Sequence, residues 1–384
     1  MSTPAGSPEK MLYWLALAQA PQLGPARAKR LAESLGGVAS VFHASLTELE
    51  AAGLHAASAQ AIFNGKAMQA AQEELVRAAS AGAQVVGLDD AAYPARLRQI
   101  YDPPLVLYVR GNVEALAQPG IAVVGTRHPT PYGVGMAERL ACDLSARGLI
   151  IISGLARGVD SAAHRGAVNA KGKTVAVLGT GVDVVYPREN KPLAESLLEI
   201  GGALVSEFAL GTFAAPQNFP IRNRIISGLA LGVLVVEAGE YSGTRITARM
   251  ALEQNRDLYA VPGNVTNKTS WGPNTLIKQG AKLTATWEDV WEELPPDVRL
   301  ALTPAEGAET ERGAAASLFS DEPLSDHERS VFRLLKADES THIDEIVQAL
   351  ETQLSSSEIF AALFELELAG KIRQLPGKNY VKAF

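Results

Sequence analysis

Six short, continuously apolar runs between residues 121 and 263 constrain the fold of this chain most strongly. They are IAVVG (121–125), LIIIS (149–153), TVAVLG (174–179), ALVSE (203–207), GVLVVEAG (232–239) and DLYAVPG (257–263). Apolar runs without alternation are typical of strands that are buried on both faces, and helical segments separate them here. The pattern predicts an α/β fold with a doubly wound, mostly parallel sheet, whose ligands bind beyond the carboxyl ends of the strands.

The segments that follow these predicted strands are rich in Gly, Ser and Thr. GTRHPTPYG follows the first run, SGLARGVDSAAH the second, GTGVDVVYPREN the third and EAGEYSGTRITA the fifth. Small residues let the backbone approach a ligand closely, and they leave N–H groups free where the next helix begins. Six arginines fall in such loops or at helix starts: Arg127, Arg157, Arg188, Arg222, Arg224 and Arg245. These features predict an anion-binding edge of the sheet.

The charge of the chain is distributed unevenly. The whole chain has a formal net charge of −7. Residues 120–290 nevertheless hold 17 Lys and Arg against 14 Asp and Glu, a net of +3, whereas residues 295–322 hold 2 against 6, a net of −4. The acidic residues therefore lie mainly outside the predicted sheet unit, where the arginines supply a local countercharge for an anion.

The segments around the predicted sheet unit, residues 83–294, have different patterns. Residues 1–82 are Ala-rich with helical periodicity broken at Gly24 and Pro25, which indicates a helical unit of the SAM or helix-hairpin-helix type. A Gly turn can present N–H groups to a phosphate, but we favour an ordinary turn of a helix bundle. Residues 295–322 are rich in Ala, Pro and Glu, and we expect them to form a flexible linker.

The last segment, residues 323–384, has the order helix, helix, helix and β-hairpin that is typical of a winged helix. We expect Ser355 or a neighbouring serine to cap a third helix that carries Glu358, Glu365 and Glu367 and no basic residue. Residues 324–384 hold 7 Lys and Arg against 10 Asp and Glu, a poor balance for neutralising the phosphates of a duplex. A protein contact or a packing role is our expectation, with a sequence-specific regulator as the alternative.

Cysteine content and hydropathy indicate the compartment and the absence of some chemistries. Cys142 is the single cysteine, so the chain has no internal disulfide and no thiolate metal cage, which fits the reducing cytoplasm. The apolar run at residues 11–20 is too short to span a bilayer. No H-E-x-x-H pattern occurs, and we expect neither a metal nor a cofactor.

Six ordered motifs together resemble the DNA-processing protein A family, also called DprA or Smf. They are VVGTR (123–127), SGLARGVDSAAH (153–164), TVAVLGTGVDVVYPREN (174–190), FPIRNRIISGLA (219–230), VVEAGEYSGTRITARMALEQNRDLYAVPG (235–263) and LIKQGAKL (276–283). The resemblance is dense across residues 83–290. It implies an extended Rossmann-like domain that binds single-stranded DNA, forms a homodimer and hands incoming strands to the RecA recombinase in natural transformation. It implies no catalysis.

The resemblance also implies residues that contact DNA. Arg127 would hold a backbone phosphate, with Ser153 and Gly154 supplying donors beside it. Arg188 matches a basic residue that family members use toward DNA. Phe219 would stack on a base, although without the resemblance its ring would be assigned to the core.

Three further predicted site residues, Arg222, Asn223 and Arg224, would line the same pocket as Phe219. The alternative for the two arginines is pairing with carboxylates at strand ends, such as Glu207 and Glu237, because a buried carboxylate needs a partner. Two carboxylates cannot form ion pairs with every arginine at this edge. We therefore expect some arginines to bind DNA and others to pair with carboxylates.

The SGTRITA run supplies the last predicted DNA-binding residues, Ser242, Gly243 and Arg245. The sequence departs from the family at two places: Arg245 stands where Leu is common, and Pro216 stands where Lys is often found. Arg245 would replace the missing lysine or extend into solvent.

A rival interpretation is an enzyme that cleaves the glycosidic bond of a nucleotide on a Rossmann-like fold. Glu237 and Glu240, beside the SGTR run, are the candidate carboxylates. Nearby arginines would favour their ionised form over a general acid, and no second tuned group is evident.

Overall fold

The computed structural model describes residues 8–240, 242–302, 324–336 and 339–382. The expected linker falls partly outside these residues. Its described part contains helix α15 (Pro296–Leu302), which forms because Val298 is buried and Leu302 packs on the core of the sheet unit. The irregular structure predicted from residue 295 therefore does not begin there.

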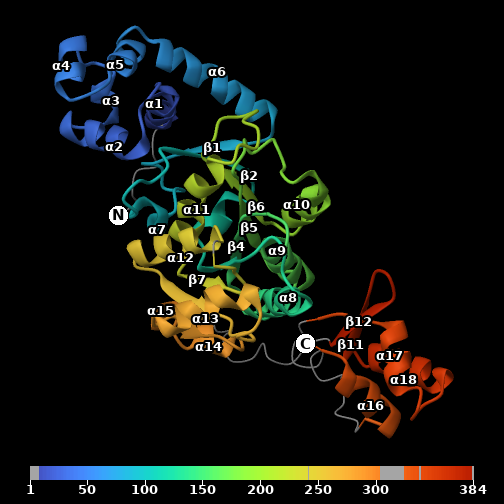
Figure 1. Cartoon of the computed structure of the whole chain (residues 1–384). Helices are drawn as coiled ribbons and strands as arrows, with labels where there is room; N and C mark the ends of the chain where they lie inside the picture. The colour runs from blue at the N-terminus through green and yellow to red at the C-terminus, as the bar shows by residue number, and fades with distance from the viewer. Residues whose placement is uncertain (1–7, 241, 303–323, 337–338, 383–384) are drawn as a thin grey trace.

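A nine-stranded sheet lies at the centre of the molecule (Figure 1). Its strand order is β1-β2-β6-β5-β4-β3-β7-β8-β9. Strands β3 to β9 are parallel, and β1 and β2 extend one edge in antiparallel fashion. The bounds are β1 (Gln84–Gly87), β2 (Val106–Gly111), β3 (Gly120–Val124), β4 (Ile150–Ser153), β5 (Thr174–Val177), β6 (Ala203–Ser206), β7 (Gly232–Val235), β8 (Asp257–Ala260) and β9 (Lys282–Leu283). The predicted α/β class is confirmed, and each of the six apolar runs contains a strand.

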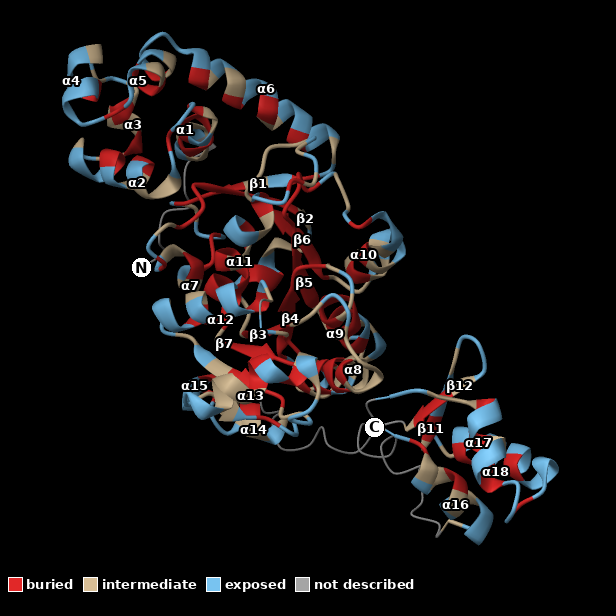
Figure 2. Cartoon of the chain, viewed as in Figure 1, coloured by how far each residue is buried: buried red, intermediate tan, exposed pale blue. Residues whose placement is uncertain are grey.

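Burial on both faces of the sheet explains the continuous apolar runs. In β3, Ile121 and Val123 point into one core, while Ala122 and Val124 point into another. The first core includes side chains of helices α8 (Pro131–Ala146) and α9 (Val159–Asn169). The second includes α11 (Asn218–Leu229) and α12 (Thr244–Glu253). Helices thus cover the sheet on both faces, as Figure 2 shows by the buried colour of the strands.

The order of the strands creates a switch point between β3 and β7. Strands β4, β5 and β6 lie to one side of β3, whereas β7, β8 and β9 lie to the other. The loops that leave β3 and β7 therefore run apart from each other at their carboxyl ends, and a crevice opens between them. Gly125 to His128 line one wall of this crevice, and Gly239, Glu240, Ser242 and Gly243 line the other.

The N-terminal helices pack against the antiparallel edge of the sheet. They are α1 (Pro8–Gln19), α2 (Pro25–Ser34), α3 (Val38–Val41), α4 (Leu46–Ala51), α5 (Ala56–Phe63) and α6 (Lys66–Ser80). Trp14 Nε1 donates to Asp89 at 2.9 Å, and the buried carboxylate of Glu74 accepts from the Leu210 N–H at 2.8 Å. One hydrophobic cluster runs from α1 into β2, so these helices share a core with the sheet.

Smaller helices complete the sheet unit: α7 (Ala95–Arg98), α10 (Lys191–Glu199), α13 (Trp271–Lys278) and α14 (Glu288–Trp291). Within the described parts of the chain, no helix combines the length and the hydropathy that crossing a membrane requires.

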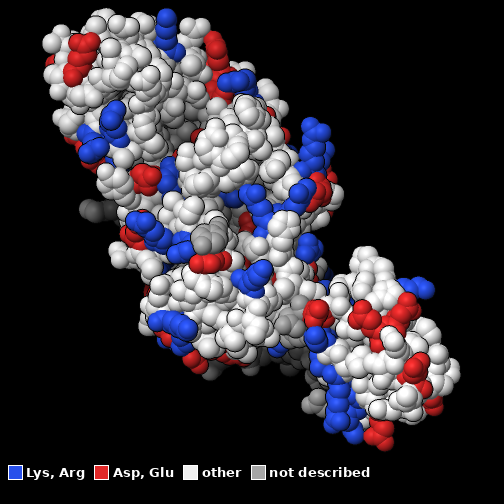
Figure 3. Space-filling model, in the orientation of Figure 1, with Lys and Arg blue, Asp and Glu red and all other residues white. Residues whose placement is uncertain are grey.

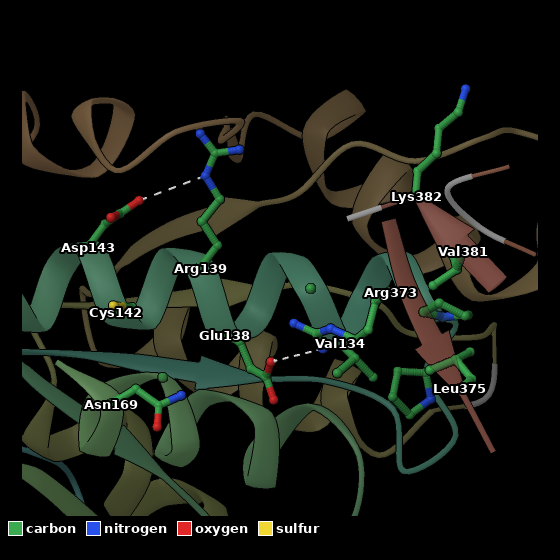
Figure 4. Close-up of a pocket in the computed structure, with 14 residues that line it drawn as sticks. Val134, Glu138, Arg139, Cys142, Asp143, Asn169, Arg373, Leu375, Val381 and Lys382 are labelled. Atoms are coloured by element: carbon green, nitrogen blue, oxygen red, sulfur yellow. Dashed lines mark ion pairs between the residues drawn. The ribbon is translucent and has the colours of Figure 1, made fainter. Parts of the chain in front are cut away.

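The C-terminal unit has the predicted winged-helix order. It comprises α16 (Asp326–Leu334), β10 (Thr341–His342), α17 (Ile343–Leu350), α18 (Ser356–Leu368), β11 (Ile372–Leu375) and β12 (Asn379–Lys382). Ser355 caps α18 in a capping box with Glu358, as expected. The β11–β12 hairpin faces α8 across a pocket of about 480 Å³, and Arg373 Nη1 lies 3.6 Å from Glu138 Oε2 (Figure 4).

Candidate nucleic-acid interface

A groove of about 790 Å³ opens at the switch point of the sheet. The loops after β3 and β7, the loop after β5 and the start of α11 line it. Figure 3 shows Lys and Arg side chains gathered over the middle of this face. Six of the predicted site residues line the groove: Arg127, Phe219, Arg222, Asn223, Ser242 and Gly243. Five lie outside its lining: Ser153, Gly154, Arg188, Arg224 and Arg245.

Arg127, Phe219 and Tyr186 form a cation and aromatic cluster on the groove wall. The guanidinium carbon of Arg127 lies 5.3 Å from the centroid of the Phe219 ring. The Tyr186 ring lies 5.8 Å from the Phe219 ring, at an interplanar angle of 39°. Phe219 is half-buried because it packs over Gly179, where an added Cβ would lie 2.8 Å from the ring. Two partly accessible rings beside a cation suit an unpaired base and its phosphate.

Tyr186 was missed by the sequence analysis. Its ring is 45% exposed and lines the groove. The signal was present in the segment VVYPREN, where an aromatic residue follows an apolar run inside a Gly-rich loop. Sequence alone does not say whether such a ring turns inward to the core or outward to a ligand.

Arg222 provides a buried positive charge beneath the groove. Its side chain is almost fully buried, and Nη1 donates to the carbonyl oxygens of Gly154, at 2.8 Å, and Val177. Nε has no hydrogen-bond partner among the described residues. Burial lowers the pKa of Arg222 to about 10, although Asp160 opposes the shift. Arg222 is thus charged at neutral pH and only partly compensated, which makes the floor of the groove attractive to an anion.

Ser153 and Gly154 do not offer the donors that we predicted for a phosphate. Ser153 Oγ is fully buried and donates to the Val123 carbonyl at 2.6 Å. The Gly154 N–H donates to Asp160 Oδ2 at 3.1 Å. Both groups are therefore satisfied within the protein. Gly154 has a packing role instead, since a Cβ at this position would overlap the Arg222 guanidinium.

Arg224 is bound by carboxylates and does not line the groove. Nη1 and Nη2 donate to the two oxygens of Glu207, each at 2.6 Å, and Nε donates to Asp102 Oδ2 at 3.0 Å. Its side chain is 6% exposed. Burial acts to lower the pKa of Arg224, but Glu207 and Asp102 reverse that effect and raise it. The prediction that Arg224 lines the same pocket as Phe219 is therefore corrected, and pairing with a strand-end carboxylate accounts for this residue.

Arg188 and Arg245 are exposed outside the groove. Arg188 begins a short 3-10 helix (Arg188–Asn190), next to the bidentate Arg157–Glu189 pair. Arg245 Nη1 donates to the Glu240 carbonyl at 2.8 Å, and its guanidinium lies 5.4 Å from the Trp271 ring centroid. Arg188 is placed to extend the cationic surface beyond Tyr186. Arg245 lies over Trp271 and is not among the residues that line the groove, whereas Pro216 is.

The two candidate catalytic carboxylates have different surroundings. Glu237 is buried and accepts from Thr130 N–H at 2.8 Å and from Thr130 Oγ1 at 2.6 Å. Thr130 is the N-cap of α8, so Glu237 occupies the helix N-terminus that would otherwise attract an anionic ligand. Glu240 is exposed and lines the groove. Glu237 therefore binds the capping residue of α8, whereas the Glu240 side chain is open to the groove.

The buried pair of Asp160 and His164, one helical turn apart, lies beneath the same loops. Asp160 accepts from the N–H groups of Gly154 and Ala156, and burial raises its pKa while Arg222 opposes the rise. His164 Nδ1 lies 2.7 Å from Thr174 Oγ1. Asp160 lines the groove, whereas His164 is fully buried and lies outside the lining.

Two family descriptions match the sequence. "DNA recombination-mediator protein A" matches residues 84–295, and "DprA winged helix domain" matches residues 315–378. The first match contains all the residues that line the groove.

Several known sequences and solved structures are similar to this chain. Protein Smf of Escherichia coli (strain K12) is 42% identical over 301 residues, which cover 78% of this chain and 77% of that protein. Protein Smf of Synechocystis sp. is 34% identical over 393 residues, which cover 96% of this chain and 98% of that protein. The X-ray structure of DNA processing protein A from Streptococcus pneumoniae has a TM-score of 0.65 and 34% identity, covering 74% of this chain and 98% of that one.

Proposed function

Because this chain belongs to the DNA-processing protein A family, also called DprA or Smf, we propose that it binds single-stranded DNA in the groove at the switch point. The observation that carries the proposal is the exposed Arg127 guanidinium over the Phe219 ring, with Tyr186 beside it. Aromatic faces stack on bases of any sequence, and a guanidinium donates to a phosphate through several N–H groups. Arg222, Asn223, Ser242 and Gly243 would complete the contact surface.

Unpaired strands suit this groove better than duplex DNA. A ring that stacks on a base needs that base to be accessible from its face, and base pairs in a duplex already stack on each other. We therefore propose binding without enzymatic turnover and with little sequence preference. Anisotropy of labelled single-stranded and double-stranded oligonucleotides, measured as salt is varied, tests this. Preference for the duplex would contradict it.

Replacing Phe219 is expected to weaken binding of single strands by about 1 to 3 kcal/mol, or about 5- to 150-fold, because one base loses its stacking partner. Phe219→Leu keeps apolar volume over Gly179, and Phe219→Ala removes it. The measurement is anisotropy with thermal melts of both variants. Phe63→Ala, at an exposed phenylalanine on α5, is the matched control. A collapse of stability with unchanged affinity per folded molecule would assign Phe219 to the core.

Arg127→Ala is expected to lower affinity and to reduce the salt dependence of binding. For single strands, the logarithm of affinity falls by about 0.7 per logarithmic unit of salt for each neutralised phosphate. Loss of one phosphate contact should flatten the slope by about that amount. Arg249→Ala is the control, because Arg249 is exposed on α12, outside the groove lining. An unchanged slope in Arg127→Ala would move the phosphate contact elsewhere.

Residues 324–384 are expected to contribute little to this binding. Their third helix, α18, has no Lys or Arg, and the whole segment has a net charge of −3. A chain that ends at residue 322 should therefore bind single strands nearly as tightly as the full chain, with the same salt slope. Comparison of the two chains in one titration series measures this. A large loss of affinity would place a DNA contact in the winged helix.

We also propose that the chain acts in the cytoplasm as a homodimer through its sheet unit and loads bound strands onto the RecA recombinase in natural transformation. The family description as a DNA recombination mediator supports the recombination role. Sedimentation tests the dimer, and RecA filament formation on single strands with and without the chain tests loading. Nucleobase release from nucleoside monophosphates would favour the alternative, a glycosidic-bond enzyme.

A further inference from the structure

Helix α18 carries a stripe of three large apolar side chains that face solvent. Phe360, Phe364 and Leu368 are 50%, 61% and 63% exposed. They are spaced by four residues, so they lie on one face of the helix. The opposite face, with Ile359, Leu363 and Leu366, is buried in the core of the winged-helix unit. We call Phe360, Phe364 and Leu368 the α18 stripe.

The sheet unit does not cover the α18 stripe. The β11–β12 hairpin is the part of the winged helix that faces α8, through Arg373 and Glu138 (Figure 4). In Figure 1, α18 lies on the side of the unit away from α8. Single exposed apolar residues are common on protein surfaces, but an adjacent row of large ones marks a place where a partner binds.

The surroundings of the α18 stripe are acidic. Glu358 and Glu365 lie on one flank and Glu367 on the other, and all three are exposed. The helix contains no Lys or Arg. In Figure 3, Asp and Glu side chains gather on the outer side of the winged-helix unit, around uncharged surface. The stripe is therefore an apolar row with two carboxylates on one flank and one on the other.

This charge pattern disfavours two occupants. A duplex would bring phosphates against the carboxylates of α18 without any cation to neutralise them. The charge pattern also disfavours a second copy of the chain as the occupant. When two α18 helices pair antiparallel about a two-fold axis, Glu365 of one helix faces Glu365 of the other. When they pair parallel, Glu365 of one helix faces Glu367 of the other. Both arrangements place like charges together at the edge of the contact.

We propose that the α18 stripe is a docking surface for a different protein, which presents an apolar helix or groove edged by Lys and Arg. Three anchors at a spacing of four residues are the pattern by which an amphipathic helix occupies an apolar groove. The carboxylates on both flanks select a partner with basic edges and discourage self-association. The proposal is independent of DNA binding, because the groove at the switch point shares no residue with α18.

Two synthetic helical peptides with the same leucine face provide the probe. One carries Lys and Arg on its flanks, and the other carries Glu. Titrated into the full chain, the basic peptide is expected to bind at least about tenfold more tightly than the acidic one. Phe364→Ser should weaken binding of the basic peptide at least about tenfold. Glu365→Lys should reduce the ratio of the affinities for the basic and the acidic peptide. Phe63→Ser, at the exposed phenylalanine of α5, should change neither.

The outcomes separate the possible occupants. Because Phe364 is exposed, Phe364→Ser should leave the thermal melt of the winged-helix unit unchanged. Equal affinity for both peptides, no binding of either, or binding that survives in Phe364→Ser would overturn the proposal. Self-association that Phe364→Ser abolishes would assign the stripe to a second copy, and duplex binding that it abolishes would assign the stripe to DNA. Either result also overturns it.

Discussion

Arg224→Ala is expected to lower the free energy of unfolding by about 3 to 5 kcal/mol and to leave single-strand affinity per folded molecule unchanged. The substitution removes a guanidinium that donates to both oxygens of Glu207 and to Asp102. The Glu207 side chain is 11% exposed, so its carboxylate would remain buried without a cation. Breaking a buried ion pair from one side costs this much because water does not replace the lost partner. Denaturant unfolding of the purified variant measures the loss.

A double-substitution cycle isolates the buried pair from simple truncation of a side chain. Arg224→Ala with Glu207→Ala should cost less than Arg224→Ala alone, because the second change removes the uncompensated carboxylate. Arg249→Ala is the matched control: it breaks the exposed pair with Glu253 and should cost only about 0.3 to 0.5 kcal/mol. If Arg224→Ala kept its normal stability but lost DNA binding, Arg224 would instead contact DNA in the groove.

The strands could be predicted because their burial leaves a local signature. The parallel strands β3 to β7 are buried along their whole length, so most of their side chains are apolar, as in Ile150 to Ile152 of β4. The position of the ligand edge followed from the same pattern, because parallel strands bring their carboxyl ends together. The linker was predicted less well, since Leu302 packs on a core that consists mostly of residues far away in the sequence.

The partners of the polar side chains could not be predicted from local sequence. Arg224 pairs with Glu207, 17 residues away, and with Asp102, 122 residues away. Ser153 uses its hydroxyl on Val123, 30 residues away. Which arginines stay free for a ligand depends on such long-range contacts. Arg127 is exposed and Arg224 is enclosed, although both stand in motifs of the same family.

Buried His164 has a single proton, and its position follows from two hydrogen bonds. Thr174 Oγ1 donates to the Ile151 carbonyl at 2.6 Å, so it must accept from His164 Nδ1 at 2.7 Å. The proton of the neutral ring therefore lies on Nδ1. The other nitrogen, Nε2, is buried and has no partner among the described residues. Burial, together with the nearby charges of Arg222 and Arg165, lowers the pKa of His164 to about 3.

The free energy of unfolding of the sheet unit is expected to fall as pH decreases below about 6.5. The reason is that His164 takes up one proton when the protein unfolds. The unfolded ring binds a proton near its ordinary pKa of about 6.5, while the folded ring stays neutral down to about 3. The stabilisation is thus complete above pH 6.5 and is lost progressively toward pH 3, at about 1.4 kcal/mol per pH unit.

His164→Asn keeps an N–H for Thr174 and removes the titration. Between pH 6.5 and 5, denaturant unfolding should show about 2 kcal/mol less loss in this variant than in the unsubstituted chain. His128→Asn, at an exposed histidine on the groove, should retain the full loss. Parallel pH profiles of His164→Asn and the unsubstituted chain would mean that the ring takes up its proton in the folded state, with a water or Asp160 as acceptor.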